Sequence, residues 1–168
     1  MINAMNAAWP LLPLLASFFL LGCRESKHDH HAGHSHHGHD HTPPHGGIPV
    51  VLGDEQYHLE FVLDAANGKL QAYVLDSHMD KFIRLTNEGF QGSIQLNSKT
   101  ESLDFRAGAS SATGEKVGDT ALFEAQADWL KATTNFLGTI PKLAVRGRTF
   151  ENIQFQFPAT HESAASQK

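Results

Sequence analysis

The chain has 168 residues, of which 40 % are hydrophobic and 18 % are charged, with thirteen Lys and Arg against eighteen Asp and Glu. This length allows one ordinary domain and hardly two, and a net charge of −5 without a basic block argues against a nucleic-acid partner. The single cysteine excludes an intramolecular disulfide and a CxxC pair. The histidines are the unusual feature, because nine of the twelve lie between His28 and His45.

The first segment, residues 1–22, has no charged side chain and contains an apolar run at residues 9–22. The run has about the length of a signal-peptide core and is short for a membrane-spanning helix. It ends in Leu20-Leu21-Gly22-Cys23, which resembles the lipobox of bacterial lipoproteins. The resemblance implies cleavage before Cys23, acylation of Cys23 and a membrane anchor that faces the periplasm. Arg24, in place of Asp, favours the outer membrane by the same analogy. The alternative is a buried helix followed by an ordinary thiol.

The second segment, residues 23–47, begins at Cys23 and has no large apolar side chain, so we predict a disordered linker. Its histidines predict transition-metal binding, because neutral imidazole suits Zn, Cu and Ni. Nine histidines suffice for about two sites of four ligands, with Asp29 and Asp40 available to assist. The predicted ligands here are His28, His30, His31, His34, His36, His37, His39, His41 and His45. A solvated spacer and a purification tag are the alternatives.

From residue 48 to residue 158 the sequence is typical of a β domain. Apolar and polar side chains alternate at residues 57–63, 90–96 and 149–157, which predicts strands with one buried face. Residues 69–75 are the expected partner of the first strand, across the turn at Asn67-Gly68. Shorter strands are expected at residues 81–85, 103–106, 120–125 and 142–145, with one helical turn within residues 128–137.

These elements predict an all-β domain, an antiparallel immunoglobulin-like sandwich of seven or eight strands. A domain of about 110 residues buries enough surface to fold without a metal. Residues 159–168 are polar, and we expect them to be a disordered tail.

The motifs His45-Gly46-Gly47, Tyr57-His58-Leu59-Glu60 and residues 73–78 (Tyr-Val-Leu-Asp-Ser-His) resemble a small periplasmic β domain associated with heavy-metal efflux adaptor proteins. The resemblance covers residues 45–96 and implies a role in metal handling, with a metal efflux complex as a candidate partner. The long helical hairpin of the adaptors has no counterpart in this sequence.

A second metal site is a further hypothesis, from the residues themselves. His58 and Glu60 share one face of their strand, and Asp76 and His78 end the predicted partner strand. If the hairpin pairs, these four side chains could form a site for Zn or Cu, which His45 could join. Ordinary polarity of an exposed strand face is the alternative.

Catalytic signatures are missing from the sequence, which has no GxSxG, HExxH or phosphate-binding loop, so we expect a protein that is not an enzyme. The favoured hypothesis is a periplasm-facing lipoprotein that binds transition metal ions, Zn or Cu first and Ni or Co next. It would buffer the ion, confer resistance or deliver the ion to an efflux system. A structural or interaction lipoprotein, whose sandwich docks a partner, and a metal sensor are the alternatives.

Overall fold

The computed structural model describes residues 42–158. The predicted signal peptide, Cys23, the eight histidines from His28 to His41 and the tail at 159–168 lie outside the described residues. Within them, no helix is long and apolar enough to cross a membrane. Eight strands are present: β1 (Ile48–Leu52), β2 (Tyr57–Asp64), β3 (Lys69–Asp76), β4 (Gly89–Leu96), β5 (Lys99–Ala107), β6 (Leu122–Gln126), β7 (Phe136–Val145) and β8 (Arg148–Phe157).

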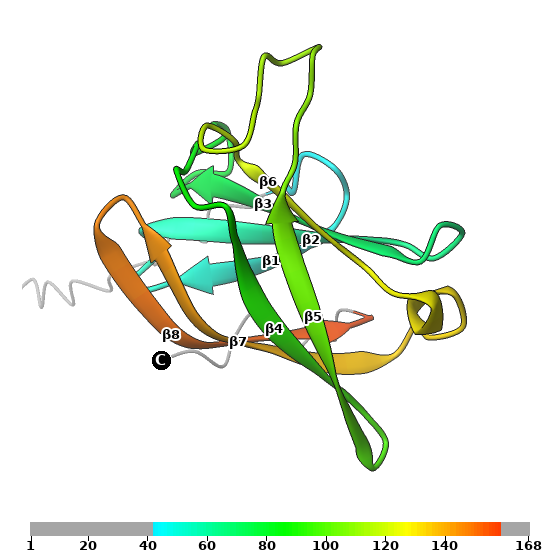
Figure 1. Cartoon of the computed structure of the whole chain (residues 1–168). Helices are drawn as coiled ribbons and strands as arrows, with labels where there is room; N and C mark the ends of the chain where they lie inside the picture. Colours follow the sequence, from blue (N-terminus) through cyan, green and yellow to red (C-terminus); the bar gives the residue numbers. More distant parts are fainter. Residues whose placement is uncertain (1–41, 159–168) are drawn as a thin grey trace, which may run out of the picture. The chain divides into compact units, whose positions relative to one another are not determined.

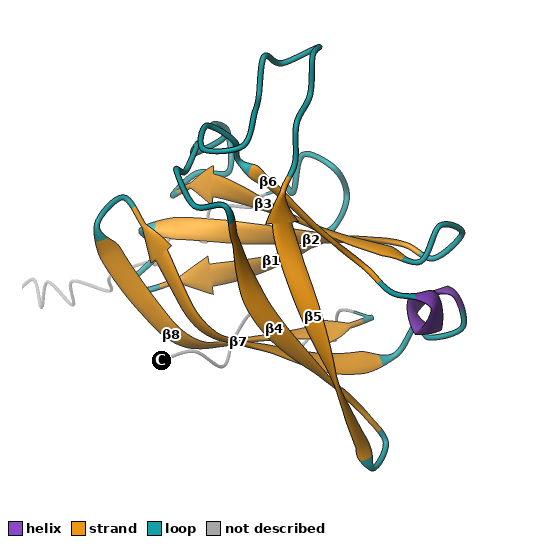
Figure 2. Cartoon of the chain, in the orientation of Figure 1, coloured by secondary structure: helices purple, strands orange, loops and turns teal. Residues whose placement is uncertain are grey.

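The eight strands form one antiparallel sheet in the order β1-β2-β3-β6-β5-β4-β7-β8 (Figure 1). The sheet curls until its two edge strands, β1 and β8, contact each other, so the fold is nearly closed and barrel-like. A single 3₁₀ turn, Asp128–Lys131, follows β6 (Figure 2). The long excursion between β5 and β6 projects away from the strands.

Phenylalanine rings fill the interior of the curled sheet. Phe61 on β2 stacks on Phe155 on β8 with ring centroids 3.9 Å apart, and Phe90 on β4 stacks on Phe105 on β5 at 4.8 Å. The Phe61–Phe155 contact joins strands from opposite ends of the sheet order and so stabilises the curled sheet, whereas Phe90 and Phe105 lie on neighbouring strands. Gly138 on β7 lacks a side chain where a Cβ would meet the Phe155 ring.

The expectation of an all-β antiparallel domain with seven or eight strands is confirmed, and so is the hairpin across Asn67-Gly68. The strands join in one curled sheet, where we expected the two sheets of a sandwich. The helical turn expected within residues 128–137 is present at Asp128–Lys131, with Leu130 buried. Two local expectations were wrong: residues 81–85 contribute only isolated bridges at Phe82 and Leu85, and β7 begins at Phe136 and not at residue 142. Strand β1 was not predicted, because Pro49 interrupts its pattern; proline is tolerated there since β1 is an edge strand.

Candidate metal-binding site

The candidate site lies on the outer face of β2 and β3, opposite the core. Alternation places Leu59 and Phe61 in the core and turns His58 and Glu60 outward. The hairpin register sets His58 beside Leu75, and Glu60 beside Tyr73. This outer face is nevertheless covered, because His58 is only 2 % exposed and Glu60 is 0 % exposed. Two neighbouring segments cover it, one before β1 and one after β3.

The segment before β1 is a tight turn that presses on β2. Its backbone closes with a hydrogen bond from the Gly46 N–H to the Pro43 carbonyl, and Pro44 restricts the backbone at the second turn position. Gly47 follows directly on β2, where a Cβ would meet the Phe61 carbonyl oxygen and lie 2.9 Å from Glu60 Cγ. The sequence Pro-Pro-His-Gly-Gly therefore holds His45 at a defined place over the sheet.

His45 and Glu60 form the central contact of the site. Glu60 Oε1 accepts hydrogen bonds from the backbone N–H groups of His45, at 2.7 Å, and Gly47, at 2.9 Å. Glu60 Oε2 lies 2.8 Å from His45 Nδ1. Burying an unpaired carboxylate costs several kcal/mol, and these three contacts offset that cost by replacing the water that Glu60 has lost. The structure thus brings two of the predicted ligands, His45 and Glu60, into contact.

Two aromatic rings complete the surroundings of the His45 imidazole. The imidazole stacks on Tyr73, with ring centroids 3.8 Å apart and ring planes 16° apart. The Phe82 ring lies tilted beside the imidazole, and the distance between their ring centroids is 5.6 Å. Burial raises the pKa of the Tyr73 hydroxyl, and the negative charges of Glu124, Glu60 and Glu115 raise it further, so the phenol stays protonated at neutral pH. Phe82 itself is 47 % exposed, which makes it one of the few large apolar side chains on the described surface.

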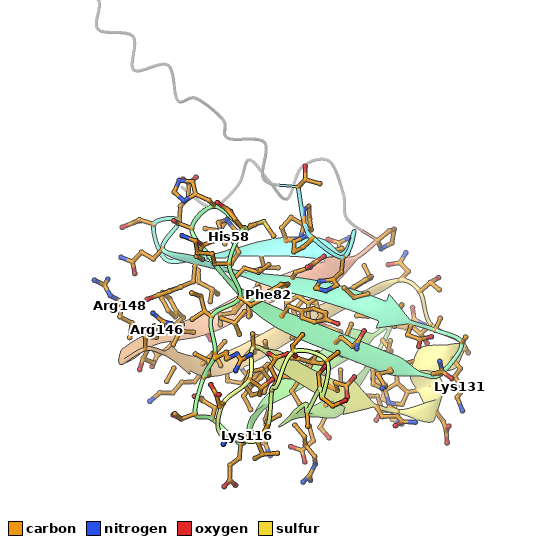
Figure 3. The ribbon with its side chains drawn as sticks, turned by 90° about the horizontal axis from the view of Figure 1, so that it is seen from above. His58, Phe82, Lys116, Lys131, Arg146 and Arg148 are labelled. Atoms are coloured by element: carbon orange, nitrogen blue, oxygen red, sulfur yellow. The ribbon has the colours of Figure 1, made fainter. Side chains whose placement is uncertain are left out.

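His58 has a different environment from His45. Its Nδ1 lies 3.1 Å from the backbone carbonyl oxygen of Asp76, and a carbonyl oxygen only accepts, so Nδ1 carries a proton. Figure 3 shows His58 on β2 and Phe82 in the segment after β3, on the same outer face. Because His58 is buried and bonded to main chain, the structure gives it a role in holding the end of the hairpin.

Of the remaining predicted ligands, Asp76 ends β3 and His78 lies in the turn that follows. The Asp76 carboxylate accepts hydrogen bonds from the backbone N–H groups of Asp80 and Lys81, so it stabilises this turn. His78 is exposed, with its Nδ1 3.0 Å from the Ser77 hydroxyl. The structure therefore does not assemble the four-ligand site of His58, Glu60, Asp76 and His78. Among residues 42–158, no three His, Cys, Asp or Glu side chains are grouped to hold a metal ion.

Comparison of the chain with protein-family models, curated proteins and solved structures found no match. The site therefore has to be interpreted from its own geometry. Sequence reasoning singled out His45 and Glu60 but missed Tyr73 and Phe82, which surround the imidazole. The register of the hairpin was a usable signal for Tyr73, since it stands directly opposite Glu60. The sequence carried no comparable signal for Phe82, which reaches the site from the segment after β3.

Proposed function

We propose that this protein is a lipid-anchored, periplasm-facing lipoprotein that binds transition metal ions through its histidine-rich arm, residues 28–45. The observation that carries the proposal is the gathering of nine of twelve histidines in that stretch. Imidazoles linked by a short chain have a high effective concentration, so several of them bind one ion together. The β domain then serves as the folded body that carries the arm, and the ion is buffered or passed to an efflux system.

The donor set supports a preference for borderline metals. Imidazole nitrogen favours Cu, Ni and Zn, whereas the oxygen ligands that Mg and Ca prefer are few in the arm. Only Asp29 and Asp40 supply carboxylates among the histidines. Without a fixed cage, the order of affinity follows the general series, in which Cu²⁺ binds more tightly than Ni²⁺ and Zn²⁺.

The test replaces the eight histidines from His28 to His41 by asparagine in the full chain, purified in detergent. We expect about two Zn²⁺ per wild-type chain and at most one in the variant, measured by equilibrium dialysis and elemental analysis at neutral pH. A matched control replaces His78 and His161, which lie outside the arm, and should keep the wild-type amount. Equal metal content in the arm variant and the wild type would refute the proposal.

A further inference from the structure

We infer that the outer face of β5, β4, β7 and β8 binds a neutral polysaccharide, the glycan strand of peptidoglycan, through its hydroxyl and acetamido groups. The four strands are consecutive neighbours in the sheet, as Figure 1 shows. The inference goes beyond the proposed function and takes from it only the periplasm-facing location, where peptidoglycan is the polysaccharide of N-acetylated sugars. It involves neither the histidines nor a metal ion.

Two registered rows of side chains make up this face, and each row crosses the four strands with one side chain per strand. One row consists of Thr100, Gln95, Leu137 and Gln156, and the other of Ser102, Ser93, Thr139 and Gln154. Neighbouring residues along the strands, such as Ile94, Gly138 and Phe155, are buried. Alternation therefore turns both rows away from the core. We call the eight side chains the amide–hydroxyl face.

The chemistry of the amide–hydroxyl face is uniform. Seven of its eight side chains are amides or hydroxyls, and none is charged. Amides and hydroxyls both donate and accept hydrogen bonds, as do the hydroxyl and acetamido groups of N-acetylated sugars. Five of the eight are exposed and three are half-buried. Solvent now occupies these groups, and a sugar can replace it without leaving a charge unpaired.

The charges at the margins of the face are balanced. Next to one margin, the Arg106 guanidinium lies 2.9 Å from the Asp104 carboxylate on the same strand. Near the other, Lys142 on β7 stands opposite Glu151 on β8. The face and its borders thus offer no excess of either sign, which favours a neutral partner over a polyanion such as a nucleic acid.

The spacing of the face fits a chain of sugar rings. Neighbouring strands lie about 5 Å apart, which is close to the length of one ring along a polysaccharide of the cellulose or chitin type. A glycan that runs across the strands therefore meets one side chain of a row with each sugar. The two rows are about 7 Å apart along the strands, so groups on both sides of the glycan find a partner.

Leu137 distinguishes a sugar from a protein as the partner. It is 41 % exposed and lies between Gln95 and Gln156 in its row. A single large apolar side chain among amides and hydroxyls is less than the apolar centre of a stable protein interface requires. It suits the C–H face of a sugar ring or an acetamido methyl group, while the flanking amides bond to the polar groups around the ring.

The first experiment is co-sedimentation of the full chain, in detergent, with purified peptidoglycan sacculi. The double variant Gln95→Ala with Gln156→Ala removes the two amides beside Leu137, and we expect the affinity to fall at least about fivefold. The matched control, Gln71→Ala with Gln126→Ala, removes two amides from the outer face of β3 and β6. It should change the affinity less than about twofold. Equal losses in both variants, or a wild-type chain that does not sediment with sacculi, would overturn the inference.

Substitutions of Leu137 test the apolar contact in both directions. Leu137→Tyr puts a flat ring at an exposed position, where it can pack on a sugar, and should tighten binding severalfold. Leu137→Asp puts a charge there and should weaken binding by a similar factor. Unchanged affinity in both variants would overturn the inference, because the centre of the face would then not touch the glycan.

NMR titration of the wild-type chain locates the site without any variant. Chitohexaose, the hexamer of N-acetylglucosamine, should shift the side-chain amide signals of Gln95 and Gln156. Cellohexaose, which has the same type of backbone without acetamido groups, should bind more weakly. Shifts confined to other parts of the domain would overturn the inference even if the double variant failed to fold.

The metal-binding proposal is tested separately from the glycan. The arm variant with eight asparagines keeps the amide–hydroxyl face and should sediment with sacculi like the wild type. Loss of sacculus binding in that variant would overturn the present inference, because the arm would then be the part that binds. A chain that binds sacculi but no Zn²⁺ would refute the proposed metal binding and support the glycan site.

Discussion

At the scale of single residues, the outer face of β2 shows how far sequence reasoning reaches. The alternation along Tyr57–Asp64 correctly placed His58 and Glu60 on the face opposite the core. It could not show that this face is covered, because the cover comes from residues 42–47 and from the segment after β3. Glu60 thus resembles a surface carboxylate in the sequence but is a buried hydrogen-bond acceptor in the structure.

Gly47 gives the prediction that belongs to this scale. Gly47→Ala places a methyl group against the Phe61 carbonyl and Glu60 Cγ, so the turn has to move away from β2. We expect a loss of about 1–3 kcal/mol in the free energy of unfolding, as for other overpacked sites. Moving the turn also displaces His45 from Glu60 and from the Tyr73 ring on which it stacks. Urea unfolding measures the loss of stability, and the NMR signals of the His45 ring report its displacement.

The control for this prediction is Gly114→Ala. Gly114 has a positive φ of 68°, so the alanine is strained, but nothing lies within 4 Å of its Cβ and it belongs to the excursion between β5 and β6. It should destabilise the domain by about 1 kcal/mol and leave the NMR signals of the His45 ring unchanged. If Gly47→Ala and Gly114→Ala had the same effect on those signals, the turn would not position His45.

At the scale of elements, local patterns predicted most strands, because one buried face leaves a period of two in the sequence. The arrangement of the strands could not be predicted in the same way. Pairings such as β3 with β6, and β4 with β7, join segments far apart in the chain and leave no local signature. The excursion at residues 108–121 is a similar case, because two charged side chains, one of them distant in the sequence, organise it.

Arg84 and Glu115 are these side chains. Arg84 donates to the Thr113 carbonyl at 2.6 Å and to the Asp119 carboxylate at 3.1 Å. Glu115 accepts the Ala121 N–H at 2.8 Å and the Thr113 hydroxyl at 2.7 Å. Burial alone would raise the pKa of Glu115, but the hydrogen bonds from Ala121, Thr113 and Thr120 and the positive charge of Arg84 outweigh it, and the pKa is lowered.

The lowered pKa predicts how the stability depends on pH. A carboxyl group whose pKa is lower in the folded than in the unfolded state stabilises the fold above its ordinary pKa of 4.5. That contribution is lost as the pH falls through the folded-state value. We expect Glu115→Gln to lower the free energy of unfolding by about 1–2 kcal/mol at pH 7, and the difference from the wild type to shrink at pH 3.

Urea unfolding at both pH values checks this prediction. Glu151→Gln is the control, because Glu151 is exposed on β8, and its effect should be small at either pH. A difference between Glu115→Gln and the wild type that is as large at pH 3 as at pH 7 would contradict the assigned role of the ionised carboxylate.

At the scale of the whole molecule, the sequence divides into an apolar start, a histidine-rich stretch and a β domain, and each division follows from composition alone. Protonation of all twelve histidines would change the formal charge from −5 to +7. At low pH the positively charged chain would therefore repel metal ions, and protons would compete with the ions for the imidazole nitrogens. Of the predicted arm ligands, only His45 lies among the described residues, where it contacts Glu60 of the domain.

The proposed anchor supplies the prediction at this scale. Cys23 follows Leu20-Leu21-Gly22, and acylation there would hold both the arm and the domain at the membrane surface, since several acyl chains together bind a bilayer stably. Cells grown with an alkyne-labelled fatty acid should label the wild-type chain. Cys23→Ala should abolish the label, because it removes both the thiol that is acylated and the cleavage site. The arm variant with eight asparagines keeps Cys23 and should be labelled like the wild type. Label that persists in Cys23→Ala, or a wild-type chain without label, would contradict the proposed acylation of Cys23.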